Sequence, residues 1–423
     1  MALKPVLGPV QLTFYSVGVI VGAGVYSVIG AAAGLAGDGL WLSFLIGAIV
    51  AALTGLSYAE MTTTFPHAGA EYVYLRHALP ERRFAAFGVG ILILVGGGAT
   101  AATVATAFGG YLQQFLDVPI VLSAMLLLVF CTAINIWGLR ESSWANMVFT
   151  TVEVGGLLLV IAAGFKADMI APLAAPPHLG VIPAAAVLFF VYLGFEEIAN
   201  MTEEVRNPAR DLPLAIFLSI AVTTLLYILV SLAAVGLVPS EQLAASQAPL
   251  TLAVQKAWPN AAPMLSAIAL FATANTVLIT LIATSRLAFS MGRDHELPAV
   301  FARVLHRRGT PWIGAVLILA IACLLVPIGD LRILAEISSL TALLAFLCVN
   351  LALILLRYAE PDRLRPFRVP LAIGRLPILP VAAIASIFVL LSQFEGRVYI
   401  AGGGLLALIW VGYALRQHAR HRR

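Results

Sequence analysis

Apolar runs about as long as a lipid bilayer is thick recur along almost the whole chain of 423 residues. A helix needs roughly 20 apolar residues to cross about 30 Å of hydrocarbon. Because 61% of the residues are hydrophobic and only 11% are charged, too little polar surface exists to cover a water-soluble globule. The sequence therefore predicts an all-α polytopic membrane protein with twelve transmembrane helices. The runs lie at about 11–32, 41–63, 84–112, 119–138, 145–165, 182–202, 213–237, 263–290, 312–328, 333–356, 376–394 and 398–415.

The basic residues of the loops predict the orientation of these helices. Of the 25 Lys and Arg residues, twenty fall in the loops and termini of one side, and one, Arg286, lies inside a run. The four on the other side are Lys166, Lys256, Arg332 and Arg397. Since cytoplasmic loops carry the excess of Lys and Arg, we expect a multi-pass protein of the plasma (inner) membrane with both termini in the cytoplasm. The net charge of +4 follows from this bias, so we expect no nucleic-acid partner.

The loops hold no recognisable enzymatic site. The longest of them run to roughly twenty residues or so, which is too short for a separate core. They contain no phosphate-binding G-x-x-x-x-G-K-S/T, no His-Glu-x-x-His and no Cys-x-x-Cys. The three cysteines, Cys131, Cys323 and Cys348, fall within apolar runs, where neither a disulfide nor a metal site is expected. We therefore expect no enzymatic activity, no cofactor and no metal, and a function that lies within the helix bundle.

Two of the runs contain sequence that weakens a helix at membrane depth. The first, VGVIVGAGVYSVIG, places Gly22 and Gly24 in mid-run, and the second, FFVYLGFEE, places Gly194 directly before two carboxylates. Broken helices occur at this depth only where they are buried in protein or line a cavity. Interruptions at corresponding positions of two repeats indicate a transporter binding site. Close packing of small residues between helices is the alternative explanation for the glycines of the first run.

Four stretches resemble one known family. GVIVGAGVYSVIG resembles the first-helix signature of the amino acid-polyamine-organocation (APC) transporters, and GFEEIANMTEEVRNPARDLPLAI resembles their sixth helix and the following loop. YAEMTTTFPHAGAEYVYLRHAL is similar to their loop after helix two, and SRLAFSMGRDHELPAVFARV to the end of helix eight and its loop. The matches run in the family's order. On this resemblance the chain is identified as a member of the APC superfamily.

The resemblance implies a LeuT-type fold in a single transporter domain spanning 1–423. Two five-helix repeats of opposite topology would occupy about 11–165 and 182–356, and two peripheral helices would follow at about 376–415. Helices one and six would be unwound midway across the membrane, around an amino acid or amine.

The same resemblance implies the residues of the substrate site. Unwinding at Gly22 to Gly24 would free amide donors at a half-helix N-terminus, where the helix dipole favours the substrate carboxylate. Carbonyls near Ile20 and from Phe190 to Leu193 would accept from the substrate ammonium. Phe190 aligns with the aromatic gate of the family, although an isolated Phe in an apolar run is commonly a core or lipid-facing residue. The predicted substrate-binding residues are Ile20, Gly22, Ala23, Gly24, Phe190, Leu193, Gly194 and Glu196.

Three residues are candidates for ion coupling. Glu153 stands where many members of the family resemble one another in having a Lys on helix five, and an ionisable group inside a span is a functional candidate by default. It is a possible proton carrier, or else the partner of a buried cation such as Arg286. Thr284 and Ser285 resemble sodium ligands of sodium-coupled LeuT-type proteins, but such hydroxyls also bond back to helical carbonyls. Proton coupling is our first expectation, sodium coupling the second and uncoupled exchange the third.

The sequence thus predicts a secondary active amino acid transporter that works by alternating access. We expect proton-coupled uptake of neutral or broad-range amino acids, as a monomer or weak oligomer in the lipid bilayer. The alternatives are an amino acid exchanger, a sodium-coupled symporter, or a carrier of cationic amino acids or polyamines. From another class, a channel or a non-transporting receptor-like protein stays open. Small residues at 96–110 either leave room for a large apolar substrate or permit close helix packing.

Overall fold

Each apolar run of the sequence is mostly helical in the structure, because a helix satisfies the backbone of such a run internally. The computed structural model describes residues 8–66, 70–81, 83–138, 143–174, 179–305 and 308–421. The α-helices are α1 (Pro9–Val21), α2 (Gly24–Ala36), α3 (Leu40–Thr64), α4 (Ala70–Ala78), α5 (Arg83–Leu112), α6 (Ile120–Trp137), α7 (Ser143–Gly164), α8 (Ala171–Ala174), α9 (Val181–Leu188), α10 (Pro208–Leu237), α11 (Ser240–Ala245), α12 (Pro249–Ala257), α13 (Ala262–Arg293), α14 (Trp312–Leu325), α15 (Leu331–Ala359), α16 (Ile378–Leu391) and α17 (Gly396–His421).

Short 3₁₀ segments and one small hairpin complete the secondary structure of the described residues. The 3₁₀ helices are η1 (Gly37–Gly39), η2 (Phe189–Tyr192), η3 (Phe195–Glu204), η4 (Pro259–Ala261), η5 (Ala299–Ala302) and η6 (Val326–Ile328). Strands β1 (Ala372–Ile373) and β2 (Leu376–Pro377) pair antiparallel, with Ala372 opposite Pro377.

Nine helical stretches of the described chain are long and apolar enough to cross a membrane. They are Gly24–Thr64, Phe84–Leu112, Ile120–Trp137, Met147–Gly164, Val181–Ala199, Pro208–Leu237, Pro259–Arg293, Leu331–Ala359 and Gly396–Ala414. The first of them joins α2 to α3 through η1. Three shorter apolar helices are Pro9–Val21, which is the first half of the predicted run 11–32, and Trp312–Ile328 and Ile378–Leu391, which occupy two further predicted runs. The chain is therefore a polytopic helical membrane protein, and α1 is short because its helix breaks after Val21.

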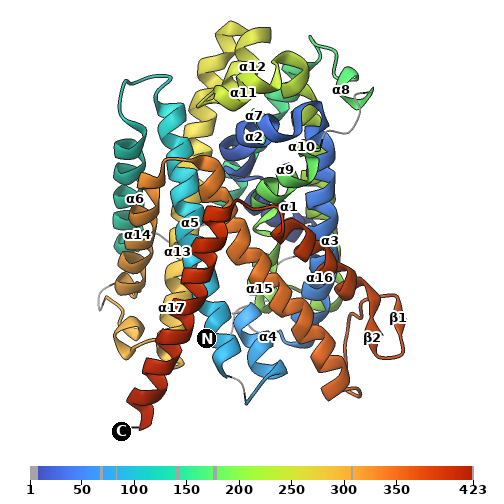
Figure 1. Cartoon of the computed structure of the whole chain (residues 1–423), viewed down its shortest axis with the longest axis vertical. Helices are drawn as coiled ribbons and strands as arrows, with labels where there is room; N and C mark the ends of the chain where they lie inside the picture. The colour runs from blue at the N-terminus through green and yellow to red at the C-terminus, as the bar shows by residue number, and fades with distance from the viewer. Residues whose placement is uncertain are drawn as a thin grey trace.

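The loops gather at two opposite ends of the bundle. Figure 1 shows α8, α11 and α12 at the upper end, and α4 together with the C-terminal end of α17 at the lower end. The connections that contain α8 and α12 carry Lys166 and Lys256. These are two of the four basic residues that were assigned to the less basic side of the membrane. The basic loop around α4 lies at the other end of the bundle.

Long helices pack around the small residues of α5. Gly96, Gly97 and Gly98 face Thr341 of α15, Thr284 of α13 and Ile321 of α14, and none of the three has room for a Cβ atom. These glycines therefore serve close packing between helices rather than leaving space beside them. Elsewhere, α3 packs along α10, and α1 packs against both α7 and α10.

Candidate functional site

The first helix break separates α1 from α2 at Gly22 and Ala23. The amide of Gly22 still bonds the carbonyl of Gly18 at 3.2 Å, whereas the amide of Ala23 leaves the helical pattern and donates to the Thr276 hydroxyl of α13 at 2.9 Å. A Cβ atom on Gly22 would stand 2.9 Å from the same hydroxyl. No side chain among the described residues caps the start of α2, so its first-turn amides form a half-helix N-terminus at the break.

The second break follows α9 and is longer. The chain passes through η2, takes an extended conformation at Leu193 and turns at Gly194, whose φ of 119° lies in the left-handed region that favours glycine. The ten residues of η3 then continue as 3₁₀ helix, although such runs rarely exceed four residues. The Gly194 amide donates to the Glu196 carboxylate at 2.8 Å, so these two predicted site residues bond each other within the break.

The two breaks contact each other through their glycines. A Cβ atom on Gly24 would lie 3.1 Å from the Cα of Val191 in η2. Reciprocally, a Cβ atom on Gly194 would lie 2.8 Å from the Cγ1 of Val19 and 3.2 Å from its carbonyl oxygen in α1. Each broken segment therefore approaches the other more closely than a side chain allows. Phe190, the predicted gate, is buried beside Val191, and Leu193 is half-buried.

Tyr227 of α10 bridges the carbonyls of both breaks. Its hydroxyl lies 2.8 Å from the Ile20 carbonyl oxygen and 3.2 Å from that of Val191, and its side chain is fully buried. Tyr227 was not among the predicted site residues. Its place in the middle of the apolar run 213–237 could have indicated it, because a buried tyrosine hydroxyl needs a hydrogen-bond partner.

Glu153 lies in α7 next to the first break. Its side chain is 1% exposed and accepts a hydrogen bond from the Asn275 amide of α13 at 3.1 Å, while its backbone carbonyl accepts from Tyr26 of α2 at 2.8 Å. Asn275 directly precedes Thr276, so one turn of α13 contacts both Glu153 and the Ala23 amide. The alternative partner, Arg286, is exposed and forms no ion pair with Glu153 in the described part of the chain.

Thr284 and Ser285 lie farther along α13. They follow Thr276 by eight and nine residues, which is about 12 Å of helix. Thr284 bonds the Thr280 carbonyl at 2.7 Å, and Ser285 bonds that of Ile282 at 2.9 Å and accepts from Asn135 of α6 at 3.2 Å. The structure thus brings Glu153 to the first break through α13, and turns Thr284 and Ser285 toward α5 and α6.

A cluster of carboxylates connects the second break to α4. Tyr58 of α3 donates to the Glu71 carboxylate of α4 at 2.6 Å, and Glu71 interacts electrostatically with Glu196 and Glu197 of η3. Burial, together with the negative charge of Glu197, raises the pKa of Glu71 to about 7, although the Tyr58 hydrogen bond acts in the opposite direction. Glu71 therefore changes charge near neutral pH at the α4 end of the bundle.

A membrane bundle whose two broken helices meet through backbone groups defines a membrane transporter rather than an enzyme. The sequence profile of the amino acid permease family matches residues 7–414, so the chain belongs to the amino acid permeases of the APC superfamily. This confirms the resemblance seen in the sequence.

Curated relatives of the chain cover nearly its whole length. The chain is 30% identical to a branched-chain amino acid permease, BcaP, of Bacillus subtilis over 90% of the chain and 86% of that protein. It is 31% identical to a methylthioribose transporter of the same organism, again over 90% and 86%. A mitochondrial cationic amino acid transporter of Arabidopsis thaliana is 33% identical over 85% of the chain and 63% of that protein.

Proposed function

We propose that this permease carries amino acids by alternating access and has the LeuT-type fold, with inverted repeats at about 11–165 and 182–356 and peripheral helices at about 376–415. The observation that carries the proposal is the glycine contact between the two breaks, Gly24 on Val191 and Gly194 on Val19. Such a contact allows small relative movements of the half-helices to open or close a site between them.

The proposed substrate site uses backbone groups. The substrate carboxylate binds the amides at the start of α2, where the helix dipole is positive. The ammonium binds the carbonyls near Ile20 and Val191, which now accept from Tyr227. Phe190 closes over the ligand. These backbone groups recognise the carboxylate and the ammonium that all amino acids share. They therefore do not select between most substrate side chains.

We infer that the substrates are neutral amino acids, or a broad range of them. The match to a branched-chain permease supports this, since the two chains align over almost their full length. The similarity to a cationic amino acid transporter makes cationic amino acids the second candidate. Glu196 does not favour them strongly, because its carboxylate is already engaged by the Gly194 amide.

Proton coupling through Glu153 is the mechanism we propose. The carboxylate is buried next to the first break and has an amide rather than a cation as its hydrogen-bond partner, so it can hold a proton without losing an ion pair. Its contact with Asn275 connects it to Thr276, which bonds the Ala23 amide. Movement of α1 and α2 during transport therefore changes the surroundings of Glu153. Sodium coupling is the second candidate, because Thr284 and Ser285 lie about 12 Å along α13 from Thr276 and donate to carbonyls of their own helix, as Ser and Thr commonly do in helices.

Uptake by proteoliposomes tests this proposal. Purified protein is reconstituted, and uptake of radiolabelled leucine and arginine is measured with an inward proton gradient, with an inward sodium gradient, and with neither. We expect saturable leucine uptake that the proton gradient drives, and countertransport when the vesicles are preloaded with leucine. Flux without saturation or countertransport would indicate a channel. Absence of flux for all substrates would contradict transport of amino acids.

A further inference from the structure

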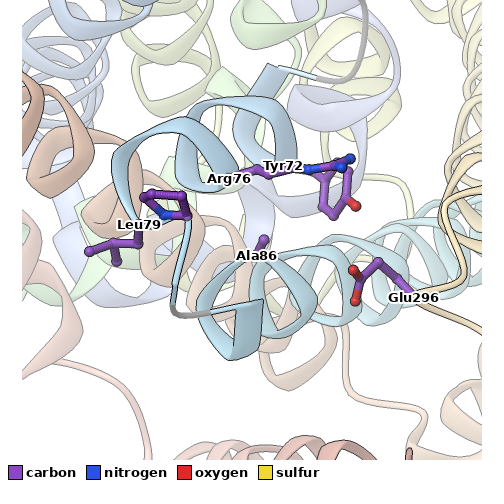
Figure 2. A pocket seen from close by; sticks show the side chains of 6 residues that line it. Tyr72, Arg76, Leu79, Ala86 and Glu296 are labelled. Atoms are coloured by element: carbon purple, nitrogen blue, oxygen red, sulfur yellow. The ribbon is translucent and has the colours of Figure 1, made fainter. Parts of the chain in front are cut away.

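A second candidate site lies away from the helix breaks. A cavity of ≈ 190 Å³ opens between α4, the start of α5 and the segment after α13, and Figure 2 shows the side chains that surround it. It is lined by Tyr72, Arg76, Leu79, Pro80, Ala86 and Glu296. Since a water molecule takes about 30 Å³, the cavity has room for about six waters or for one small organic molecule. None of its lining residues belongs to α1, α2, η2 or η3.

Tyr72 presents a buried hydroxyl to this cavity. The residue is 4% exposed, and its hydroxyl makes no well-formed hydrogen bond among the described residues, although it interacts with the Asp294 carboxylate. Figure 2 shows the hydroxyl turned toward the Glu296 carboxylate across the cavity. Burial, with the nearby charges of Glu296 and Asp294, raises the pKa of Tyr72 to about 12, so the group keeps its proton. A polar ligand in the cavity would give this hydroxyl a well-formed hydrogen bond.

Opposite charges flank the hydroxyl. Arg76 projects from α4 beside the Tyr72 ring, and its guanidinium is 3.7 Å from the Asp294 carboxylate, a separation longer than a hydrogen bond. Glu296 is buried on the other side of the cavity. Leu79, Pro80 and Ala86 supply an apolar wall. A cation, an anion and a hydroxyl around a small apolar space complement a small molecule that itself carries both charges.

We propose that this cavity binds a small zwitterionic α-amino acid, with the ligand carboxylate on Arg76 and Tyr72 and its ammonium on Glu296. The inference rests on the proposed function, because it assigns a second site to the same class of substrate. The charge bias predicts that this end of the bundle faces the cytoplasm, so the site would sample released substrate. A bound ligand would connect α4 to α5 and to the segment after α13.

The stoichiometry of binding tests the second site. Equilibrium dialysis of the purified full chain with radiolabelled alanine, up to millimolar concentration, is expected to give two ligands per chain. Gly24→Val should remove the ligand at the helix breaks and leave one. Tyr72→Phe should also leave one, by weakening the second site at least about tenfold, the equivalent of one hydrogen bond to a charged group. Tyr358→Phe, which alters an exposed tyrosine of α15, should keep two.

Each result decides between the two sites. One ligand per chain that Gly24→Val abolishes and Tyr72→Phe leaves unchanged would overturn the second site and support the first. One ligand that only Tyr72→Phe removes would support the second site and contradict the site at the breaks. In the Gly24→Val protein, alanine methyl ester and N-acetylalanine should fail to compete with alanine, because each lacks one of the two charges. Competition by either at alanine's concentration would overturn zwitterion recognition.

Discussion

The hydroxyl of Tyr227 donates to the carbonyl of Ile20 at 2.8 Å across 207 residues of sequence. Ile20 lies two residues before the first break, and its carbonyl is one of those that the sequence analysis assigned to a substrate ammonium. The same hydroxyl is 3.2 Å from the Val191 carbonyl at the second break. One side chain of α10 thus contacts both broken helices. Because each carbonyl oxygen has two lone pairs, a substrate ammonium can bind these carbonyls while Tyr227 holds them in place.

Replacing Tyr227 by Phe should destabilise the protein and weaken substrate binding. The variant leaves two buried carbonyls without their shared donor, which we expect to lower the free energy of unfolding by about 1–3 kcal/mol. Denaturation in detergent, followed by tryptophan fluorescence, measures this change. Leucine affinity should fall by about tenfold in the same preparation, since the carbonyls lose their fixed arrangement. Tyr358→Phe serves as the control, and equal effects of the two variants would contradict a special role for Tyr227.

Replacing Gly24 by Val should abolish amino acid binding at the breaks. The added Cβ would be 3.1 Å from the Val191 Cα, so the two broken segments must separate to admit it. Gly404→Val on α17 is the matched control, because no atom lies within 4 Å of the position its Cβ would occupy. We expect leucine uptake to vanish in the first variant and to persist in the second, while both elute as single species in size-exclusion chromatography. Normal leucine affinity in the Gly24 variant would refute the backbone site.

The positions of the breaks could be predicted, because their cause is local. Glycines at Gly22, Gly24 and Gly194 weaken a helix by their own nature, and two carboxylates after Gly194 make a regular span costly. The family resemblance was confirmed by a family profile that matches residues 7–414, which include both breaks. The close contact of the two breaks follows from glycine too, but which residue each glycine meets depends on packing.

The partners of the breaks could not be predicted from local pattern. Thr276 bonds the Ala23 amide across 253 residues, and Asn275 bonds Glu153 across 122. The position of an Asn or Thr within a long apolar helix does not indicate which residue of another helix it bonds. Thr284 and Ser285 attracted attention instead because they are adjacent and resemble ion ligands. In the structure their hydroxyls bond the preceding turn, the arrangement that a helix offers every Ser and Thr.

Glu153→Gln should abolish the pH dependence of leucine uptake. The Gln side chain retains an oxygen that accepts from Asn275, so the fold is preserved while the titratable proton is lost. Initial rates in proteoliposomes between pH 5 and pH 8 should become flat, and the proton gradient should no longer drive accumulation. Glu241→Gln, an exposed change on α11, should leave the profile unaltered. A wild-type pH profile in the Glu153 variant would assign this residue to structure.

Glu71 should make the protein less stable as pH rises toward neutrality. Its pKa in the folded protein is about 7 against 4.5 for an ordinary glutamate, so the folded state binds more protons than the unfolded state between these values. The contribution of Glu71 to the free energy of unfolding is therefore greatest below pH 4.5. It is lost as pH rises through 7, by on the order of 3 kcal/mol. Glu71→Gln should remove that part of the pH dependence in thermal melts. An unchanged difference between pH 5 and pH 7.5 would contradict the shifted pKa.

A buried ion cluster holds α3 to α15 at the α4 end of the bundle. Glu60 is fully buried and accepts from the Nε of Arg357 at 3.0 Å, from a second nitrogen of the same guanidinium, and from the amide of Val369 at 2.7 Å. Arg365 adds a second guanidinium 3.4 Å from the same carboxylate. The cluster therefore joins two long helices to the segment that precedes β1.

Arg357→Leu should lower the free energy of unfolding by about 3–5 kcal/mol, because it leaves Glu60 buried with too few donors. Arg363→Leu is the matched control. Arg363 also pairs with a glutamate, Glu360 at 2.5 Å, but both side chains are more than one-third exposed, so its loss should cost at most about 1 kcal/mol. Urea denaturation in mild detergent measures both variants against wild type. If water reaches Glu60 and replaces the lost donors, the two variants will show similar losses, and the cluster would then count as a surface ion pair rather than as the joint between α3 and α15.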